Sequence, residues 1–269
     1  MLIAVPILTM RSMAEERHSR TDQLVLTAPV SLGKMIFGKF LAMVGVFTVA
    51  VAVIAVTPLV LAAFGTVPMG ENYVAVLGFW LYGCTCIAVG MLASALTESQ
   101  VIAAVVAFAF LFLGYMMNSI TGLIGDHLIT KVLGAYDLYT PLQSFMSGCL
   151  DLTGVVYFVS VTALCLFLTC QCVQKRRWSM TTKKLTTGMF SVAMIVVGFA
   201  VAVAVNMVVK EMPSSWTAVD ATSTKLYSLT DTTKDYVKNL SQDVTIYVLS
   251  SEKSADSTLA ETLQRYEDL

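Results

Sequence analysis

Long uncharged apolar runs constrain this sequence more than any other feature. Between Phe40 and Gln174 only six Asp, Glu, Lys or Arg residues occur, and all of them lie at or between the ends of apolar runs. A helix needs about 20 apolar residues to cross the hydrocarbon core of a bilayer. Five runs are long enough: roughly 39–64, 74–96, 100–120, 154–173 and 187–209. We therefore predict an all-α polytopic membrane protein with about five complete transmembrane helices.

The composition agrees with this prediction, because 57% of the 269 residues are hydrophobic and only 13% are charged. An ordinary soluble domain is less apolar than this. The opening segment MLIAVPILTM has ten residues, which at about 1.5 Å per residue cannot cross a core about 30 Å thick. We interpret it as the end of a truncated span and ETLQRYEDL as the interior of a helix, so we expect a fragment at both ends.

Lys and Arg residues gather in two loops, and this asymmetry predicts the orientation of the spans. Ten of them lie within residues 11–39 and 175–184, whereas the loops on the other side hold one, Lys131. Both basic loops are therefore predicted to be cytoplasmic, and everything after residue 209 extracytoplasmic. The connection 121–153 then lies outside, where short helices dipping into the interface and an ordinary loop are both open.

The end of the chain has a different character. Residues 210–269 carry a net charge of −4, against +3 for residues 1–209. The runs TKLYSL, TDTTKDYVKNL and DVTIYVLS have the patterns of a strand, a helix and a strand. We predict that residues 211–269 begin an extracytoplasmic α/β domain, which is too short to bury a complete core.

Candidate metal and catalytic groups are few. Five of the six cysteines lie in or at the ends of spans, where free Cys behaves as a small apolar residue. The two histidines, His18 and His127, are predicted on opposite sides of the membrane, so a set of four zinc ligands cannot converge. The sequence lacks a nucleotide-binding loop of the form G-x-x-x-x-G-K-[ST] and a hydrolase set of Ser, His and Asp. We expect no metal site, no cofactor bound by this chain, no enzymatic activity and no nucleic-acid partner.

Two features of the spans bear on transport. Ion-coupled transporters usually carry an ionisable residue at membrane depth, and the predicted spans have none, so energy for uphill transport must come from elsewhere. Gly83, Gly90 and Ser94 give one span a surface of small side chains, with Gly90 and Ser94 four residues apart. This spacing is typical of close contacts between membrane helices.

A charged island, Arg11–Lys34, interrupts the apolar sequence, and the segment around it resembles a known family. PILTMRSMAEERHSRTDQLVLTAPVSLGKMIFGKFLA is similar to the segment after the second span of type-2 ATP-binding-cassette (ABC) exporter permeases. LYGCTCIAVGMLASALTESQVIAA and SFMSGCLDLTGVVYFVSVTALCLFLT resemble later spans of the same family, so the resemblance covers about residues 1–178. Residues 220–250 are similar to the start of the auxiliary component found beside gliding-motility-type ABC permeases.

The resemblance implies a permease subunit of an ATP-driven exporter in the plasma membrane. It implies a separate ABC ATP-binding subunit that uses ATP and Mg, and a second permease copy or homologous subunit. It also divides the chain into a permease domain at 1–178, a cytoplasmic loop with an additional span at 179–210, and the start of the auxiliary domain at 211–269.

The resemblance also implies that the cytoplasmic loop at the charged island docks on the ATPase. Glu15, Glu16 and Arg17 then seat a short helix in a groove of the ATPase. The segment with Thr27, Pro29 and Ser31 turns the chain toward the next span, and the fixed φ and missing N–H of proline suit such a turn.

Two hypotheses are open. The first is a transport subunit, which the number of spans and the elaborate cytoplasmic loop favour. The second is a non-transporting scaffold that anchors an extracytoplasmic sensor or assembly domain. For the charged island itself, the alternative is a solvated loop that only sets orientation.

Overall fold

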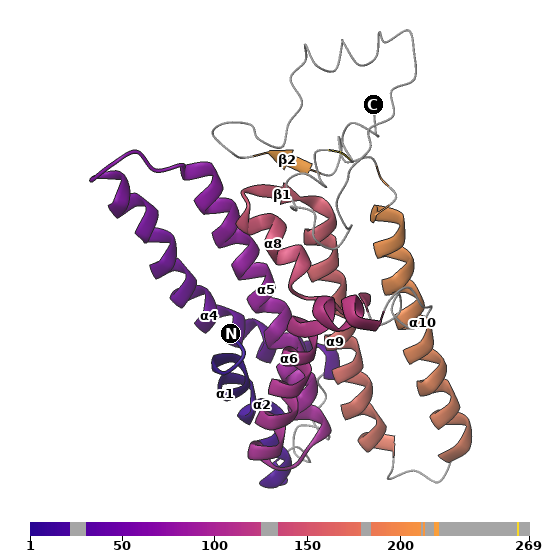
Figure 1. Cartoon of the computed structure of the whole chain (residues 1–269). Helices are drawn as coiled ribbons and strands as arrows, with labels where there is room; N and C mark the ends of the chain where they lie inside the picture. Colours follow the sequence, from indigo (N-terminus) through magenta and orange to yellow (C-terminus); the bar gives the residue numbers. More distant parts are fainter. Residues whose placement is uncertain are drawn as a thin grey trace, which may run out of the picture.

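The structure is a bundle of long helices that run side by side (Figure 1). The computed structural model describes residues 1–21, 31–124, 134–178, 184–210, 212, 218–220 and 263. The long helices are α4 (Leu32–Ala62), α5 (Met69–Leu96), α6 (Gln100–Ile124), α9 (Leu152–Trp178) and α10 (Lys184–Lys210). The first four are long and apolar enough to cross a membrane, and the apolar stretch found in α10, Ala193–Val209, is shorter. The prediction of an all-α polytopic membrane protein is confirmed.

The helices extend beyond the apolar runs that predicted them. Helix α4 begins at Leu32 rather than at residue 39, and α9 continues to Trp178 rather than ending at 173. Hydropathy marks only the part of a helix that suits lipid, whereas helical hydrogen bonding can continue into the flanking charged residues. The additional turns therefore carry the Lys and Arg residues that border the spans.

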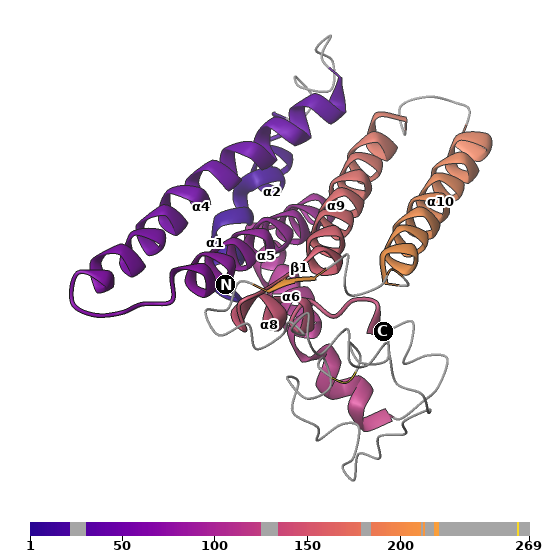
Figure 2. The same cartoon turned by 90° about the horizontal axis from the view of Figure 1, so that it is seen from above.

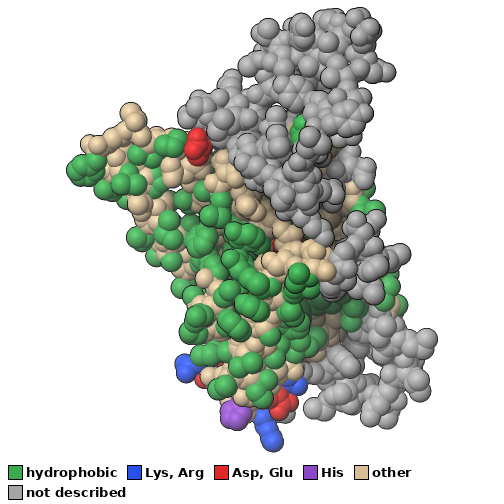
Figure 3. All heavy atoms as spheres, viewed as in Figure 1, with side chains coloured by type: hydrophobic (Ala, Val, Ile, Leu, Met, Phe, Trp, Pro, Cys, Tyr) green, Lys and Arg blue, Asp and Glu red, His purple; other side chains and the backbone are tan. Residues whose placement is uncertain are grey.

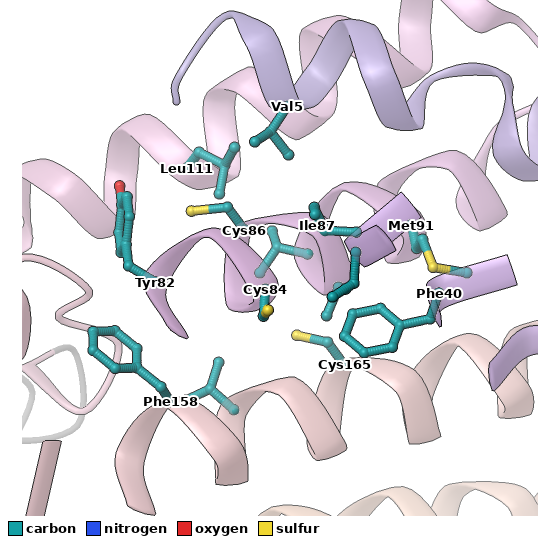
Figure 4. Packing of buried hydrophobic residues seen from close by; sticks show 14 of the residues in the cluster. Val5, Phe40, Tyr82, Cys84, Cys86, Ile87, Met91, Leu111, Phe158 and Cys165 are labelled. Carbon is teal, nitrogen blue, oxygen red and sulfur yellow. The ribbon is translucent and has the colours of Figure 1, made fainter. Parts of the chain in front are cut away.

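Helix α5 lies at the centre of the bundle. Its most apolar stretch is 67% buried inside the protein, compared with 22–28% for α4, α6 and α9. Figure 2 shows α5 between α4 and α9, with α10 beyond α9. The core around it also includes Val5 of the short helix α1 (Ala4–Thr9). Figure 4 shows this packing, in which three cysteines act as small apolar side chains: Cys84, Cys86 and Cys165.

The helices alternate in direction, so their connections lie at two ends of the bundle (Figure 1). One end holds the short helix α2 (Arg11–His18), the first turns of α4 and the junction between α5 and α6. Figure 3 shows that the Lys, Arg and His side chains of the visible face gather there. We call it the charged end. This alternation agrees with the sequence of crossings predicted from the apolar runs.

At the opposite end, residues 134–151 form a structured connection between α6 and α9. It contains the short helix α8 (Thr140–Met146). Asp137 binds the start of α8, since its Oδ1 accepts hydrogen bonds from the backbone N–H groups of Tyr139 (3.0 Å) and Thr140 (3.2 Å). Leu138 and Phe145 are fully buried. Of the two alternatives for 121–153, this described part has a short helix, while residues 125–133 lie outside the described residues.

A two-stranded ribbon completes this end. Strand β1 (Cys149–Asp151) pairs antiparallel with β2 (Ala218–Asp220), and Cys149 is opposite Asp220. Gly148 turns the chain from α8 into β1 with a φ of 79°, a left-handed conformation that glycine adopts without steric cost. Strand β2 was not predicted from the sequence. The strands and helix predicted between residues 224 and 250 lie outside the described residues.

Candidate functional site

The candidate site is α2, which follows α1 at the charged end. Met10 joins the two helices with helical φ and ψ values of −55° and −34°. Ser94 of α5 meets the chain here: its Oγ accepts hydrogen bonds from the N–H groups of Met13 (3.1 Å) and Ala14 (3.0 Å), and donates one to the carbonyl of Met10 (3.1 Å). The first turn of a helix has N–H groups that need such partners. A hydroxyl from α5 thus fixes the start of α2.

Close approach of the helices depends on glycine. Gly90 lies one turn before Ser94, and a Cβ atom there would overlap the side chain of Thr9 in α1. Thr9 is fully buried, and its Oγ1 donates to the carbonyl of Val5 at 2.9 Å. Gly83 faces the ring of Phe47 in α4 in the same way. The three small residues singled out in the sequence, Gly83, Gly90 and Ser94, therefore line the surface of α5 on which α4, α1 and α2 pack.

Two ion pairs also connect α2 to α4 and to the junction between α5 and α6. Glu16 pairs with Lys39 of α4, whose Nζ also donates to the carbonyl of Ser12 at 3.1 Å. Arg17 Nη2 lies 3.2 Å from Glu98 Oε1, at the junction between α5 and α6. Both Glu16 and Arg17 therefore have partners within the chain. Lys39 and Glu98 were not predicted as site residues from the sequence, although each has the charge opposite to that of its partner in α2.

Glu15 differs from its neighbours. Its side chain is 53% exposed, and its contact with Arg11, which is 68% exposed, is 3.9 Å long. An exposed ion pair of this length contributes little to stability. Glu15 is thus the carboxylate of α2 that is most available to a partner.

The remaining predicted site residues lie in the segment after α2. Thr27 and Pro29 are outside the described residues. Ser31 has extended backbone angles (φ −68°, ψ 130°), and its carbonyl accepts hydrogen bonds from Lys34 N (3.0 Å) and Met35 N (3.3 Å). Ser31 therefore marks the point where the chain enters α4. Within the described residues, no group of three or more His, Cys, Asp or Glu side chains could hold a metal ion.

The model of a family described as "ABC-2 family transporter protein" matches residues 1–173, from α1 into α9. The chain belongs to this ABC-2 family. Comparisons with curated proteins and with solved structures gave no match.

Membership in the ABC-2 family defines the class of the protein. It is a multi-pass membrane protein and a permease subunit of an ABC transporter, and the family implies association with an ABC ATP-binding subunit. The residues of this ABC-2 permease that match the family model include the whole site at the charged end: α2, Lys39, Ser94 and Glu98. Helix α10 and strand β2 lie beyond it.

Proposed function

We propose that this permease couples to its ATP-binding subunit through α2. One observation carries the proposal: α2 is fixed to the transmembrane helices by Ser94 while its Glu15 side chain is half exposed at the surface. Such a helix can contact a partner and pass on its movement. The ATP-binding subunit uses ATP and Mg, and this chain binds neither.

The contacts of α2 provide the route by which movement reaches the bundle. Ser94 links α2 to α5, Lys39 links it to α4, and Glu98 links it to the start of α6. Helix α5 is the most buried of the spans. Because packed interfaces switch between arrangements rather than deform continuously, a displacement of α2 shifts these helices together.

Three further parts of the proposal follow from the resemblance described above. Transport is export, residues 211–269 begin a fused extracytoplasmic auxiliary domain, and a second permease copy or homologous subunit completes the transporter. Large apolar side chains such as Val49, Val53 and Phe108 are exposed on α4 and α6, where a second subunit can pack. Both lipid and another permease suit such surfaces.

Copurification tests the proposal directly. Full-length protein purified in mild detergent from its own host is expected to bring a stoichiometric ABC ATPase with it. Repeated absence of an ATPase would contradict coupling and favour the scaffold hypothesis.

The substitution Glu15→Lys is expected to weaken binding of the ATPase. Breaking a desolvated charge pair at an interface costs about 2 to 5 kcal/mol, so association falls roughly 30-fold or more. Insertion should be retained, because the change adds positive charge to the side predicted to be cytoplasmic. The measurements are pull-down of the ATPase and transport-coupled ATP hydrolysis at equal membrane expression.

Two controls make this test specific. Glu71→Lys is the same change in the first turn of α5, at the opposite end, and should leave binding intact. The exchange Glu16→Lys with Lys39→Glu keeps an internal ion pair of reversed polarity and loses the bond from Lys39 to the carbonyl of Ser12, so it should keep α2 on α4 with a small loss of stability. Unchanged association and activity in Glu15→Lys would show that this carboxylate is solvated, and its coupling role would be withdrawn.

Orientation can be tested by labelling. In a variant without the six native cysteines, Ser241→Cys is expected to react with an impermeant reagent in intact cells or spheroplasts, because the Lys and Arg asymmetry places the tail outside. Ser179→Cys, in the second basic loop, should react only after permeabilisation. The reverse pattern would invert the whole topology.

A further inference from the structure

Among the described residues after α9, two elements contact the permease, α10 and β2. Helix α10 lies along α9 (Figures 1 and 2), and Asn206 Nδ2 donates to Ser160 Oγ at 2.7 Å across this interface. Farther on, β2 pairs with β1 at the end of the bundle opposite α2. Helix α10 and β2 lie outside the family match, whereas Ser160 and β1 lie inside it. Both contacts thus join the additional segment to the ABC-2 region.

We propose that β1 is a docking edge for β2 of the same chain, so that the segment after α10 is held on the permease rather than loosely tethered. The partner is residues 218–220, and the interaction is the addition of a strand through backbone hydrogen bonds. This inference does not depend on coupling through α2, because it concerns the other end of the molecule.

The docking edge is held in place by packing. Cys149 is fully buried at the start of β1, and Gly148 fixes the turn before it. Phe145, at the end of α8, packs so closely on α5 and α9 that a Cβ at Gly78 or Gly154 would collide with it. The turn at Gly148 and the contacts of Phe145 with α5 and α9 do not involve β2, so they position β1 independently of the pairing and lower the entropy lost when β2 pairs.

Helix α10 places β2 close to the edge of β1. Asn206 fixes α10 against Ser160, and Gly198 lets α10 approach Phe167 and Leu164 of α9. Residues 211–217 separate α10 from β2, and these seven residues can span at most about 25 Å. A short connection from a fixed helix gives a high effective concentration at β1. This geometry favours the strand of the same chain over that of a second copy.

Docking on β1 connects the tail to the helices that flank it. Strand β1 lies between α8 and α9 in the chain, and Phe145 joins α8 to α5 through Gly78. A shift of α8 or α9 during the transport cycle would therefore be passed to β2, and a docked β2 would restrain α8.

A disulfide trap tests the pairing with one substitution. Asp220→Cys faces native Cys149 in the observed register. Opposite residues of antiparallel strands have Cα atoms about 4.5 to 5.5 Å apart, within the range of a disulfide. After mild oxidation of full-length protein in native membranes, mass spectrometry of unreduced peptides is expected to find an intrachain link from Cys149 to residue 220 in most molecules.

The neighbouring positions provide matched controls. Val219→Cys is one residue out of register and lies on the other face of the ribbon, and Ala218→Cys is opposite Asp151. Each is expected to form at least fivefold less of the link to Cys149. The double variant Leu150→Cys with Val219→Cys tests the opposite face, and it decides the question if Asp220→Cys fails to insert.

Three results would overturn the proposal. Absence of a link in both Asp220→Cys and the double variant would show that the strands do not pair. Equal linking at 218, 219 and 220 would show a tail that visits β1 without a register. A link between two chains rather than within one would show that a second copy supplies the strand.

Discussion

Substitution of Gly90 by leucine is expected to separate α1 from α5 and to destabilise the permease by about 3 kcal/mol, near the upper end of the cost of overpacking a core. The new side chain would overlap Thr9 at its first atom. Thr9 is fully buried and bonded to the carbonyl of Val5, so it cannot swing away cheaply. Thermal unfolding in detergent should show a clear fall in Tm.

Gly45→Leu is the matched control for this prediction. Gly45 lies in α4, and a Cβ added there meets no atom within 4 Å. Leucine at this exposed position in a span should therefore leave Tm nearly unchanged. Similar Tm values for Gly90→Leu and Gly45→Leu would refute the close packing of α1 on α5.

The second large effect is expected for Ser94→Ala. This change removes the hydroxyl that bonds Met10, Met13 and Ala14, and a buried polar group without a partner costs about 1 to 3 kcal/mol. We expect the free energy of unfolding to fall by about 2 to 3 kcal/mol. The loss is not larger because some of the freed backbone groups can form other hydrogen bonds. Glu15 remains exposed in this variant, so the ATPase should still bind, while its hydrolysis should be poorly coupled to transport.

The two site variants can therefore be distinguished. Glu15→Lys should reduce ATPase pull-down, whereas Ser94→Ala should reduce transport per ATP hydrolysed with a smaller change in pull-down. Ser147→Ala, which removes an exposed hydroxyl bonded to the carbonyl of Gln143 in α8, is the control for loss of a serine. Full coupling in Ser94→Ala would remove Ser94 from the proposed route.

The sequence predicted the helices well for a physical reason. In lipid the backbone must satisfy its own hydrogen bonds, so a long apolar run leaves a helix as the simplest solution. The small surface around Gly90 and Ser94 was also visible in the sequence, because close packing of membrane helices requires small side chains. The sequence did not show that α1 and α2 are the elements that pack on this surface.

The ion pairs of α2 with Lys39 and Glu98 join residues that are far apart in the sequence, and such contacts cannot be predicted from a sequence pattern. The contact of Glu15, Glu16 and Arg17 with an ATPase stays a prediction, but the sequence did not show that Glu16 and Arg17 also contact Lys39 and Glu98 within the chain. Those contacts depend on the tertiary placement of α2, α4 and the α5–α6 junction. Strand β2 was missed for a related reason: three residues carry no alternating pattern, and only pairing with β1 defines them as a strand.

The glycines of α5 also limit how the bundle can move. Gly78, Gly83 and Gly90 each receive a side chain from a different element, namely Phe145 of α8, Phe47 of α4 and Thr9 of α1. Helix α5 thus packs closely against three neighbours at successive positions along its length. If α5 rotated about its own axis, larger side chains of α5 would replace these glycines at the contacts and would collide with Phe145, Phe47 and Thr9. Any conformational change that preserves these contacts must move α5 together with α1, α4 and α8 as one rigid body. Relative sliding of helices must then occur at other helix interfaces.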